Sequence, residues 1–303
     1  MSSILNFGSI NIDMVYSVAH FVRAGETLAA DSVAIHPGGK GLNQSIALSL
    51  AGGRVFHAGK IGADGLWTKE LLKERGVDVS LLSEHGSGTG TAVIQVDKTG
   101  QNCILLNHGA NYEITPDQIE ESLSPFGVGD MLVLQNEINA LPEIIAAAAA
   151  RGMTIALNPS PIDDALLKMD LSAVSFFLLN EIEGEAFTGE SEPRKICSAL
   201  LSRWPHARIV LTLGKRGVFY RDSQQECKSG IFNVTAVDTT AAGDTFTGFF
   251  LAAISSGKAV QEALSLASTA SAIAVTRPGA ATSVPTLEEV LSAKLDYAGD
   301  PEI

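Results

Sequence analysis

The feature that most constrains this chain is a repeated alternation of short, continuously apolar segments with longer segments of helical periodicity. Residues 131–135, 154–158, 176–180 and 209–213 are apolar runs without the polar alternation of a half-exposed strand. Such runs are typical of strands in a parallel sheet that helices cover on both faces. The sequence therefore predicts an α/β fold with a mostly parallel central sheet, and 303 residues could form one large domain or two small ones.

Polar residues recur where the predicted strands end. The first predicted strand, residues 4–7, is followed by Asn11 and Asp13. The later strands end in or are followed by Asn136 with Glu137, Asn158, Asn180, and Thr212 with Gly214. In an open parallel sheet the ligand lies beyond the carboxyl ends of the strands. We therefore expect an active site along this edge of the sheet.

Residues 237–246 contain the most specific local signal. Two small residues and a glycine, at 241–243, precede Asp244 at the predicted start of an apolar helix. Small residues let an anion approach the backbone, and the free N–H groups at a helix start hold it. A carboxylate beside such a site can orient a hydroxyl toward phosphorus, which favours phosphoryl transfer to an alcohol. An aspartate here is also typical of a plain helix cap.

A second glycine-rich segment covers residues 36–44, with glycines at 38, 39 and 41. It lets the backbone approach a small polar ligand, and Lys40 and Asn43 add donors that suit vicinal hydroxyls. The segment lacks the P-loop pattern, and no GxGxxG follows the first strand, which disfavours a nicotinamide dehydrogenase. By itself such a turn is more commonly structural.

Two segments do not fit the strand–helix alternation. Residues 91–96 and 102–106 flank a turn that contains Gly100, which predicts a β-hairpin, and residues 14–35 are also extended in character. We expect a small β lid, from about 14–35 and 90–107, that excludes water from the reaction. An ordinary surface hairpin fits the same pattern. Because a lid exposes edges and a face, we expect a homodimer formed through it.

Composition excludes several other classes. The net charge of −13 disfavours nucleic-acid binding. Cys103, Cys197 and Cys227 lack metal or redox spacing, which suits reduced thiols in the cytoplasm. The first residues lack the basic and apolar regions of a signal peptide, and no apolar run is long enough to cross a membrane. We therefore expect a cytoplasmic protein without a membrane partner.

Taken together, residues 8–13, 38–44 and 241–244 resemble the ribokinase-like (PfkB) family of carbohydrate kinases, over about residues 6–285. The resemblance implies a single domain over residues 1–303, with a three-layer sandwich and a β-sheet lid. It also implies ATP-dependent transfer of the γ-phosphoryl group to a primary hydroxyl of a small sugar. The branch of the family that the chain resembles most converts D-ribose to ribose 5-phosphate. The run before Gly109, Ala110 and Asn111 departs from that branch and would reshape the lid side of the pocket.

Other acceptors remain as alternatives. They are deoxyribose, a fructose-type sugar, or a nucleoside, whose base could pack on Ile104 and Leu106. A sugar-binding module without catalysis is a further alternative. It would lose Asp244, Gly243 or the NxxE motif at 180–183 first, and all three are present.

The resemblance also implies roles for single residues. The sugar ligands would be Asn11, Asp13, Gly39, Lys40, Asn43, Glu137 and Asp244. Asp244 would be the catalytic base, with Ala241, Ala242 and Gly243 as its anion hole. The nucleotide would lie along Asn180, Thr212, Gly214 and Gly217, and Glu183 would act through water on Mg²⁺ and the phosphates. A K⁺ ion would bind, largely through backbone carbonyls, at Asp238, Thr240, Ala274, Arg277, Gly279 and Ser283.

Overall fold

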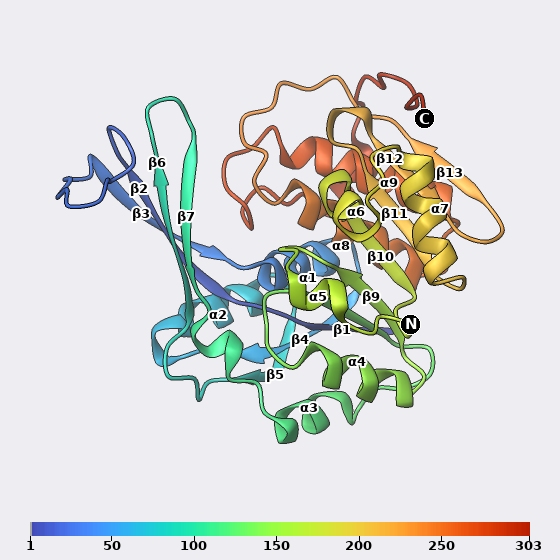
Figure 1. Cartoon of the computed structure of the whole chain (residues 1–303), viewed down its shortest axis with the longest axis horizontal. Coiled ribbons are helices and arrows are strands. Elements are labelled where there is room, and N and C mark those ends of the chain that lie inside the picture. Colours follow the sequence, from blue (N-terminus) through green and yellow to red (C-terminus); the bar gives the residue numbers. More distant parts are fainter. Residues whose placement is uncertain (1) are drawn as a thin grey trace.

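The computed structural model describes residues 2–303, which form two separate β-sheets (Figure 1). The larger sheet has nine strands in the order β13-β12-β11-β10-β9-β8-β1-β4-β5, and the smaller has four in the order β3-β2-β6-β7. The strands of the larger sheet are β1 (Ser3–Phe7), β4 (Arg54–Lys60), β5 (Asp78–Ser83), β8 (Met131–Gln135), β9 (Thr154–Asn158), β10 (Phe176–Asn180), β11 (Arg208–Thr212), β12 (Val218–Arg221) and β13 (Glu226–Ser229). Those of the smaller sheet are β2 (Asn11–Ser17), β3 (Ser32–Gly38), β6 (Gly90–Val96) and β7 (Asn102–Asn107).

The larger sheet is mostly parallel, as the sequence predicts. All neighbouring pairs from β5 to β11 run parallel, and only the pairs β11–β12 and β12–β13 are antiparallel. The sequence pattern did not predict these last two strands. Each has only four residues, and β13 (ECKS) lacks the apolar run that marks the buried strands.

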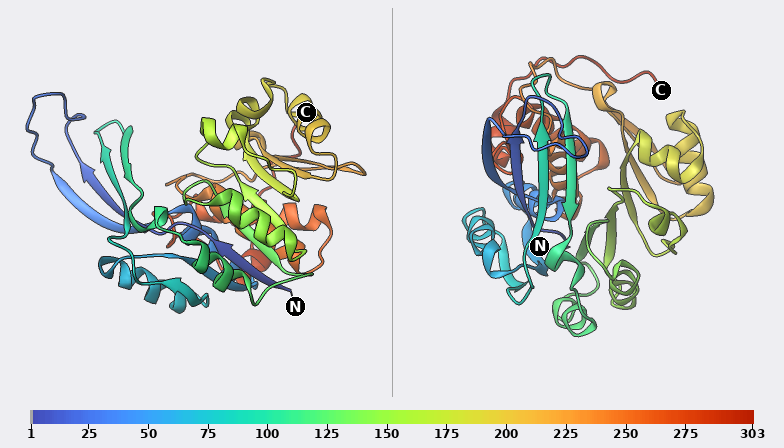
Figure 2. Two further views of the ribbon diagram at one scale, coloured as in Figure 1. Left: turned by 60° about the horizontal axis from the view of Figure 1, so that its bottom comes forward. Right: turned by 60° about the vertical axis from the view of Figure 1, so that its left-hand side comes forward.

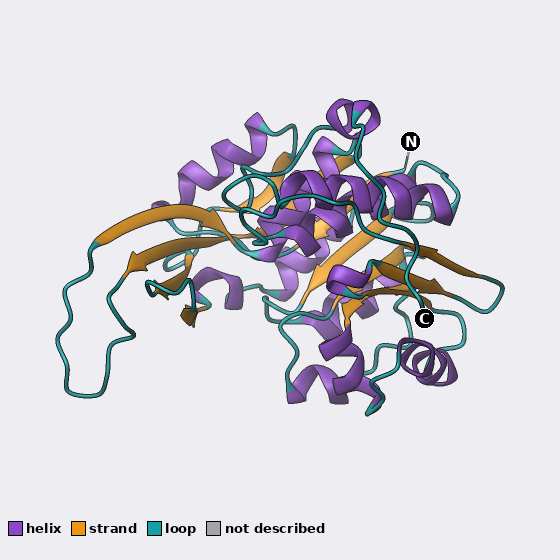
Figure 3. Ribbon diagram, turned by 90° about the horizontal axis from the view of Figure 1, so that it is seen from above, coloured by secondary structure: helices purple, strands orange, loops and turns teal. Residues whose placement is uncertain are grey.

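Helices cover both faces of the larger sheet, as Figure 3 shows. Along each central strand successive side chains enter different cores: Ile4 packs on one face and Leu5 on the other. The first face packs against α1 (Lys40–Leu50), α2 (Leu66–Glu74), α8 (Ala242–Ser255), α9 (Val260–Ala274) and α10 (Leu287–Ser292). The second packs against α3 (Pro116–Leu123), α4 (Leu141–Ala150), α5 (Asp164–Lys168), α6 (Glu181–Thr188) and α7 (Pro193–Arg203).

Short 3₁₀ turns complete the described structure: η1 (Ala63–Gly65), η2 (Gly109–Tyr112) and η3 (Gly214–Arg216). Over residues 2–303, we find no helix that combines the length and the apolar character needed to cross a bilayer.

Helices α1 and α8 pack unusually close to each other. A Cβ atom on Gly248 would lie 2.4 Å from the Cβ of Ala47, so the two backbones touch at this point. Helix α1 follows the glycine-rich segment 36–39, and α8 begins directly before Asp244. The close packing therefore brings the first turns of both helices to one place at the edge of the sheet.

The smaller sheet projects from the body of the molecule (Figures 1 and 2). Strands β6 and β7 form the predicted antiparallel hairpin, and β2 pairs with β3 antiparallel and with β6 parallel. The boundaries at about 14–35 were too narrow, because β2 begins at Asn11 and β3 continues to Gly38. Both predicted sugar-binding segments therefore include residues of the lid sheet itself.

Candidate active site

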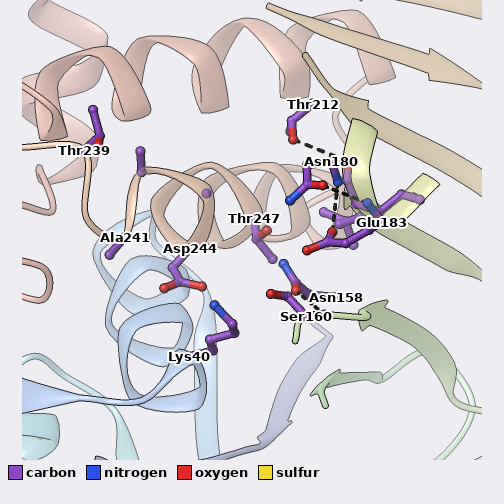
Figure 4. A pocket seen from close by; sticks show the side chains of 14 residues that line it. Lys40, Asn158, Ser160, Asn180, Glu183, Thr212, Thr239, Ala241, Asp244 and Thr247 are labelled. Carbon is purple, nitrogen blue, oxygen red and sulfur yellow. Dashed lines mark hydrogen bonds between the residues drawn. The ribbon is translucent and has the colours of Figure 1, made fainter. Parts of the chain in front are cut away.

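A pocket lies at the carboxyl ends of β9, β10 and β11, beside the starts of α1 and α8 (Figure 4). The polar residues that line it are Lys40, Asn158, Ser160, Asn180, Glu183, Thr212, Thr239, Asp244 and Thr247. Five of them were predicted as site residues from the sequence: Lys40, Asn180, Glu183, Thr212 and Asp244. These polar side chains meet because the carboxyl ends of parallel strands lie at the same edge of the sheet.

The start of α8 presents free backbone donors to this pocket. Ala241 adopts a left-handed conformation (φ 56°), and its carbonyl accepts the N–H of Thr245. Gly243 and Asp244 have no hydrogen-bond partner for their N–H groups within residues 2–303. A Cβ atom on Gly243 would meet nothing within 4 Å, so the space beside these donors is open. The N–H of Ala242 differs, because it donates to the carbonyl of Thr239 at 3.3 Å.

The Asp244 carboxylate is buried, and two amides from α1 hold it. Asn43 Nδ2 donates to its Oδ2 at 3.1 Å, and Gln44 Nε2 donates to its Oδ1 at 2.9 Å. Burial raises the pKa of Asp244, while Lys40 and the two amide donors lower it, and the pKa remains above its ordinary value. Asp244 is thus a fixed carboxylate facing the pocket, as a general base requires.

Lys40 is a partly buried cation that faces Asp244 (Figure 4). Burial lowers the pKa of its ammonium group, but the carboxylates of Asp244, Glu137 and Glu183 raise it more strongly. The result is a pKa above the ordinary value. Lys40, which was predicted as a sugar ligand, therefore interacts with Glu137, a predicted sugar ligand, and also with Glu183, which was predicted to act on the phosphates.

The glycine-rich segment holds Glu137 in place. Glu137 Oε2 accepts the backbone N–H of Lys40 at 2.9 Å and a short hydrogen bond from Ser9 Oγ. Ser9 Oγ itself accepts the N–H of Gly41 at 3.2 Å. Ser9 was not among the predicted site residues, because a serine in a glycine-containing turn carries no distinct signal in the sequence.

Asn111 fixes the orientation of Asn11. Its Nδ2 donates to Asn11 Oδ1 at 2.8 Å and to the carbonyl of Ile10, while its Oδ1 accepts the N–H of Ile10. The carbonyl of the Asn11 amide is thereby engaged, and its NH₂ group is the part left for a ligand. Asn111 follows the run that departs from the family pattern, and its hydrogen bonds connect η2, after β7, to the segment at residues 8–13.

Asp13 lies on β2 with one carboxylate oxygen, Oδ1, buried and without a partner in the described chain. Burial, and then the nearby charge of Glu137, raise its pKa to about 6. Gly38 pairs with Asn11 on the neighbouring strand β3 and so lies diagonal to Asp13, and a Cβ atom on it would come within 2.2 Å of the Asp13 carboxyl group. A buried acceptor without a donor is costly unless a ligand supplies one, which suits a sugar hydroxyl.

The NxxE motif is a helix cap. Asn180 Oδ1 accepts the N–H of Glu183 at 2.9 Å, and Glu183 Oε2 accepts the N–H of Asn180 at 2.9 Å. This capping box starts α6 and leaves Glu183 Oε1 at the pocket. Thr212 also lines the pocket, whereas Gly214 and Gly217 lie in the turn around η3 and are not part of its lining.

The two segments predicted to bind K⁺ lie together. Asp238 accepts the N–H of Thr240 at 2.9 Å with Oδ1 and the N–H of Gly279 at 2.9 Å with Oδ2. Arg277 turns its side chain to Glu289 at 2.6 Å, and its N–H donates to the carbonyl of Ala274. Ser283 is buried and donates to the carbonyl of Ala280. In the part of the chain that is described, no three His, Cys, Asp or Glu groups form a metal cluster.

Comparison with known proteins gives a consistent result. The model of the pfkB family of carbohydrate kinases matches residues 1–287. A ribokinase of Haemophilus influenzae is 36% identical over 298 residues, covering 94% of this chain and 95% of the relative. The crystal structure of a ribokinase of Cryptococcus neoformans in complex with ADP has a TM-score of 0.83 and 32% identity, and the match covers 96% and 99% of the two chains. An Arabidopsis thaliana ribokinase complexed with ribose and ATP has a TM-score of 0.82 and 26% identity over 96% and 98%.

The layered α/β fold and the pocket, with its buried carboxylate beside free helix N–H groups, are those of a phosphoryl-transfer enzyme. The chain belongs to the pfkB family of carbohydrate kinases. The predicted fold class and the predicted class of enzyme, an ATP-dependent carbohydrate kinase, are thereby confirmed.

Proposed function

We propose that this protein transfers the γ-phosphoryl group of ATP to the primary hydroxyl of D-ribose and so forms ribose 5-phosphate. The observation that supports it most is Asp244, a buried carboxylate held by Asn43 and Gln44 beside the unpaired N–H groups of α8. The relatives named above are ribokinases, one of them bound to ribose and ATP.

In the proposed reaction Asp244 accepts a hydrogen bond from the sugar's primary hydroxyl and takes its proton as the bond to phosphorus forms. The N–H groups of Gly243 and Asp244 stabilise the charge on the transferred oxygens. Lys40, held as a cation between the carboxylates, balances charge on both sides. Because the transition state is loose, this positioning and charge stabilisation matter more than the strength of the base.

The sugar would be held from the lid side. The Asn11 amide, oriented by Asn111, offers an NH₂ donor, and the free Asp13 oxygen offers an acceptor. Glu137 is fixed by Ser9 and Lys40 in the same region. Gly39 and Asn43 complete the proposed set, and the unpartnered Asn43 Oδ1 is a further buried acceptor.

The residues present also fit the two proposed ions. Mg²⁺ prefers hard oxygen ligands and would be held mainly by the nucleotide, which agrees with a single uncommitted carboxylate oxygen on Glu183; when bound, it neutralises phosphate charge. For K⁺, the carboxylate of Asp238 ties the loops at 238–240 and 277–283 together and leaves a donor set rich in carbonyls. Replacing K⁺ by tetramethylammonium is expected to lower kcat several-fold, and an unchanged kcat would exclude a role for the ion.

The decisive test of the acceptor is a panel of D-ribose, 2-deoxyribose, fructose and nucleosides in a coupled assay of ADP release with Mg²⁺ and K⁺. D-ribose should give the highest kcat/KM, and the product should release phosphate only on phosphatase treatment. A higher kcat/KM for a nucleoside or a hexose would contradict ribose as the acceptor. Because a single sugar hydroxyl decides between ribose and 2-deoxyribose, both must be compared at saturating ATP.

The lid also supports the proposed homodimer. The strand register places Ile35, Met14, Val93 and Leu105 directly opposite one another across all four strands, and hence on one face. Ile35 is 59% exposed and Leu105 is 72% exposed. Asp13 points to the opposite face of the lid sheet, toward the predicted sugar-binding segment at residues 38–44. An apolar face of this kind, on the side away from the site, suits a second copy of the lid.

Leu105→Glu is expected to shift the protein from dimer to monomer, because it places a charge at the most exposed position of that apolar row. Size-exclusion chromatography with light scattering measures the change. Lys98→Glu, in the exposed turn of the same hairpin, is the matched control and should leave the dimer intact. A wild-type protein that is monomeric at all concentrations would contradict a dimer through the lid.

A cytoplasmic location completes the proposal. It is supported by the three free cysteines, Cys103, Cys197 and Cys227, none of which forms a disulfide.

A further inference from the structure

A chain of buried amides leads from the base into the core, and the first of them is Gln44. Its Nε2 donates to Asp244 Oδ1 at 2.9 Å, and its Oε1 accepts Gln135 Nε2 at 2.7 Å. Gln135 Nε2 also donates to Asn6 Oδ1 at 3.0 Å. All three amide side chains are fully buried, so none of them can contact a substrate.

The far end of this chain is a backbone carbonyl. Asn6 Nδ2 donates to the carbonyl of Gly41 in α1 at 2.7 Å, and to Ser45 Oγ at 2.8 Å. A carbonyl can only accept, so Asn6 must direct its NH₂ toward Gly41 and its oxygen toward Gln135. Gln135 must then direct its NH₂ toward Asn6, and the same NH₂ meets the oxygen of Gln44. Gln44 is left with its NH₂ toward Asp244.

The orientation of every amide is therefore determined, and one group is left without a partner as a result. Gln135 Oε1 is buried and unpartnered in the described chain. It lies against Gly8, where a Cβ atom would come within 2.4 Å of it. A flip of Gln135 would satisfy neither neighbour, because two carbonyl oxygens would then face a third. A buried oxygen without a hydrogen-bond donor lowers the stability of the fold, so a role beyond stability would explain why this arrangement is present.

We propose that Gln44 is a positioning residue for the base Asp244, and that Gln135 acts through Gln44 by fixing which end of its amide faces the carboxylate. Because it concerns the base of phosphoryl transfer, this inference rests on the proposed function. A reversed Gln44 would present a carbonyl oxygen to the carboxylate and repel it. The fixed donor instead favours the ionised form of Asp244 and holds its oxygens at one rotation.

The other charged groups near the base act on it independently of this chain. Lys40 from α1 and Glu137 from the segment after β8 both face Asp244, and Glu183 from α6 faces Lys40. Asn43 donates to the second carboxylate oxygen. A change at Gln135 removes none of these four groups, and the shortest hydrogen-bonded path from Gln135 to Asp244 runs through Gln44.

The test compares Gln44→Met and Gln135→Met, which keep the volume of the side chain but remove its donors, with Ser45→Ala as the control. Ser45 is equally buried and bonds Asn6 and His57, yet it lies on a branch that leads away from Asp244. We expect kcat to fall about 10²-fold in Gln44→Met and about tenfold in Gln135→Met, with the KM for ATP unchanged. Ser45→Ala should keep kcat within about twofold of wild type.

A second readout does not depend on activity. The pKa of Asp244, followed by carboxyl-carbon NMR of ¹³C-labelled aspartate, should rise by about one pH unit in both glutamine variants, because a donor to the ionised form is lost or misdirected. The acid limb of the kcat profile should move to higher pH by the same amount. Thermal unfolding reports the folded fraction, so that kcat is expressed per folded enzyme.

Each outcome decides the proposal. Wild-type kcat and an unshifted Asp244 titration in folded Gln135→Met, or in Gln44→Met if the former does not fold, would overturn it. A loss of activity that follows only the loss of folded protein would do the same. If the wild-type protein phosphorylates no acceptor while the Asp244 titration still shifts in the variants, the proposed function fails and the positioning of Asp244 stands.

Discussion

Asp244→Asn is expected to lower kcat by about 10²–10⁴ and to leave the affinity for ATP nearly unchanged. The asparagine has the size of the aspartate but cannot take the proton of the sugar hydroxyl. It also presents an NH₂ group to Asn43 or Gln44, which are both donors to the wild-type carboxylate. Steady-state kinetics with ribose gives kcat, and titration calorimetry gives the Kd of ATP.

Asp117→Asn is the matched control for this experiment. Asp117 is also an aspartate in the first turn of a helix, α3, but it is exposed and lies outside the pocket. It should keep full activity. Equal turnover of Asp244→Asn and wild type would refute the assignment of Asp244 as the base, and a large loss in Asp117→Asn would show that the effect is not specific to the pocket.

Asp13→Asn is expected to raise the KM for the sugar by about 10²-fold and, at the same time, to stabilise the folded protein at neutral pH. The sugar loses a charged acceptor at the unpartnered Oδ1. The stability gain follows from the pKa of Asp13, which folding raises from 3.8 to about 6 by burial and by Glu137. A carboxyl group with a raised pKa destabilises the folded state once it is ionised, by about 3 kcal/mol at most here.

The sign of the pH dependence can be checked directly. Below the unfolded pKa of 3.8 the group is protonated in both states and costs nothing. As the pH rises toward 6, the folded wild type loses stability that Asp13→Asn keeps, so the difference in unfolding free energy should grow over this window. Urea unfolding at several pH values between 4 and 7 measures it. A difference in unfolding free energy that stays constant over that range would contradict the raised pKa of Asp13. For the KM of the sugar, the control is Asp31→Asn, in the exposed loop of the lid, which should leave the KM unchanged.

The sequence predicts those parts of the fold that depend on continuous apolar runs. The predicted strands at 131–135, 154–158 and 176–180 coincide with β8, β9 and β10, because a strand buried on both faces is apolar over most of its length. The lid was predicted too short, since at Asn11, Asp13 and Gly38 the strands carry polar or small residues that face a ligand site rather than a core.

The polar interior of the site is less accessible to sequence reasoning. Asp244 was identified because its signal is local, in the small residues and the helix that surround it. Gln44 and Gln135 were not, because each is an ordinary amide in its own segment and acquires its role only from partners about 90 to 200 positions away. Asn111 was not given a role, because only the run before Gly109, Ala110 and Asn111 was identified as a departure from the family pattern. The roles assigned to single site residues remain predictions.

The contact between Gly248 and Ala47 has a consequence for the tolerance of this protein to mutation. Both positions are buried and neither lines the pocket, yet a larger side chain at either would push α1 away from α8 and separate the amides of one helix from the carboxylate of the other. Random mutagenesis screened for loss of turnover should therefore recover substitutions at these two small residues in a protein that is still folded. The turnover of the enzyme is therefore expected to depend on the spacing between two buried helices as well as on the residues that line the pocket.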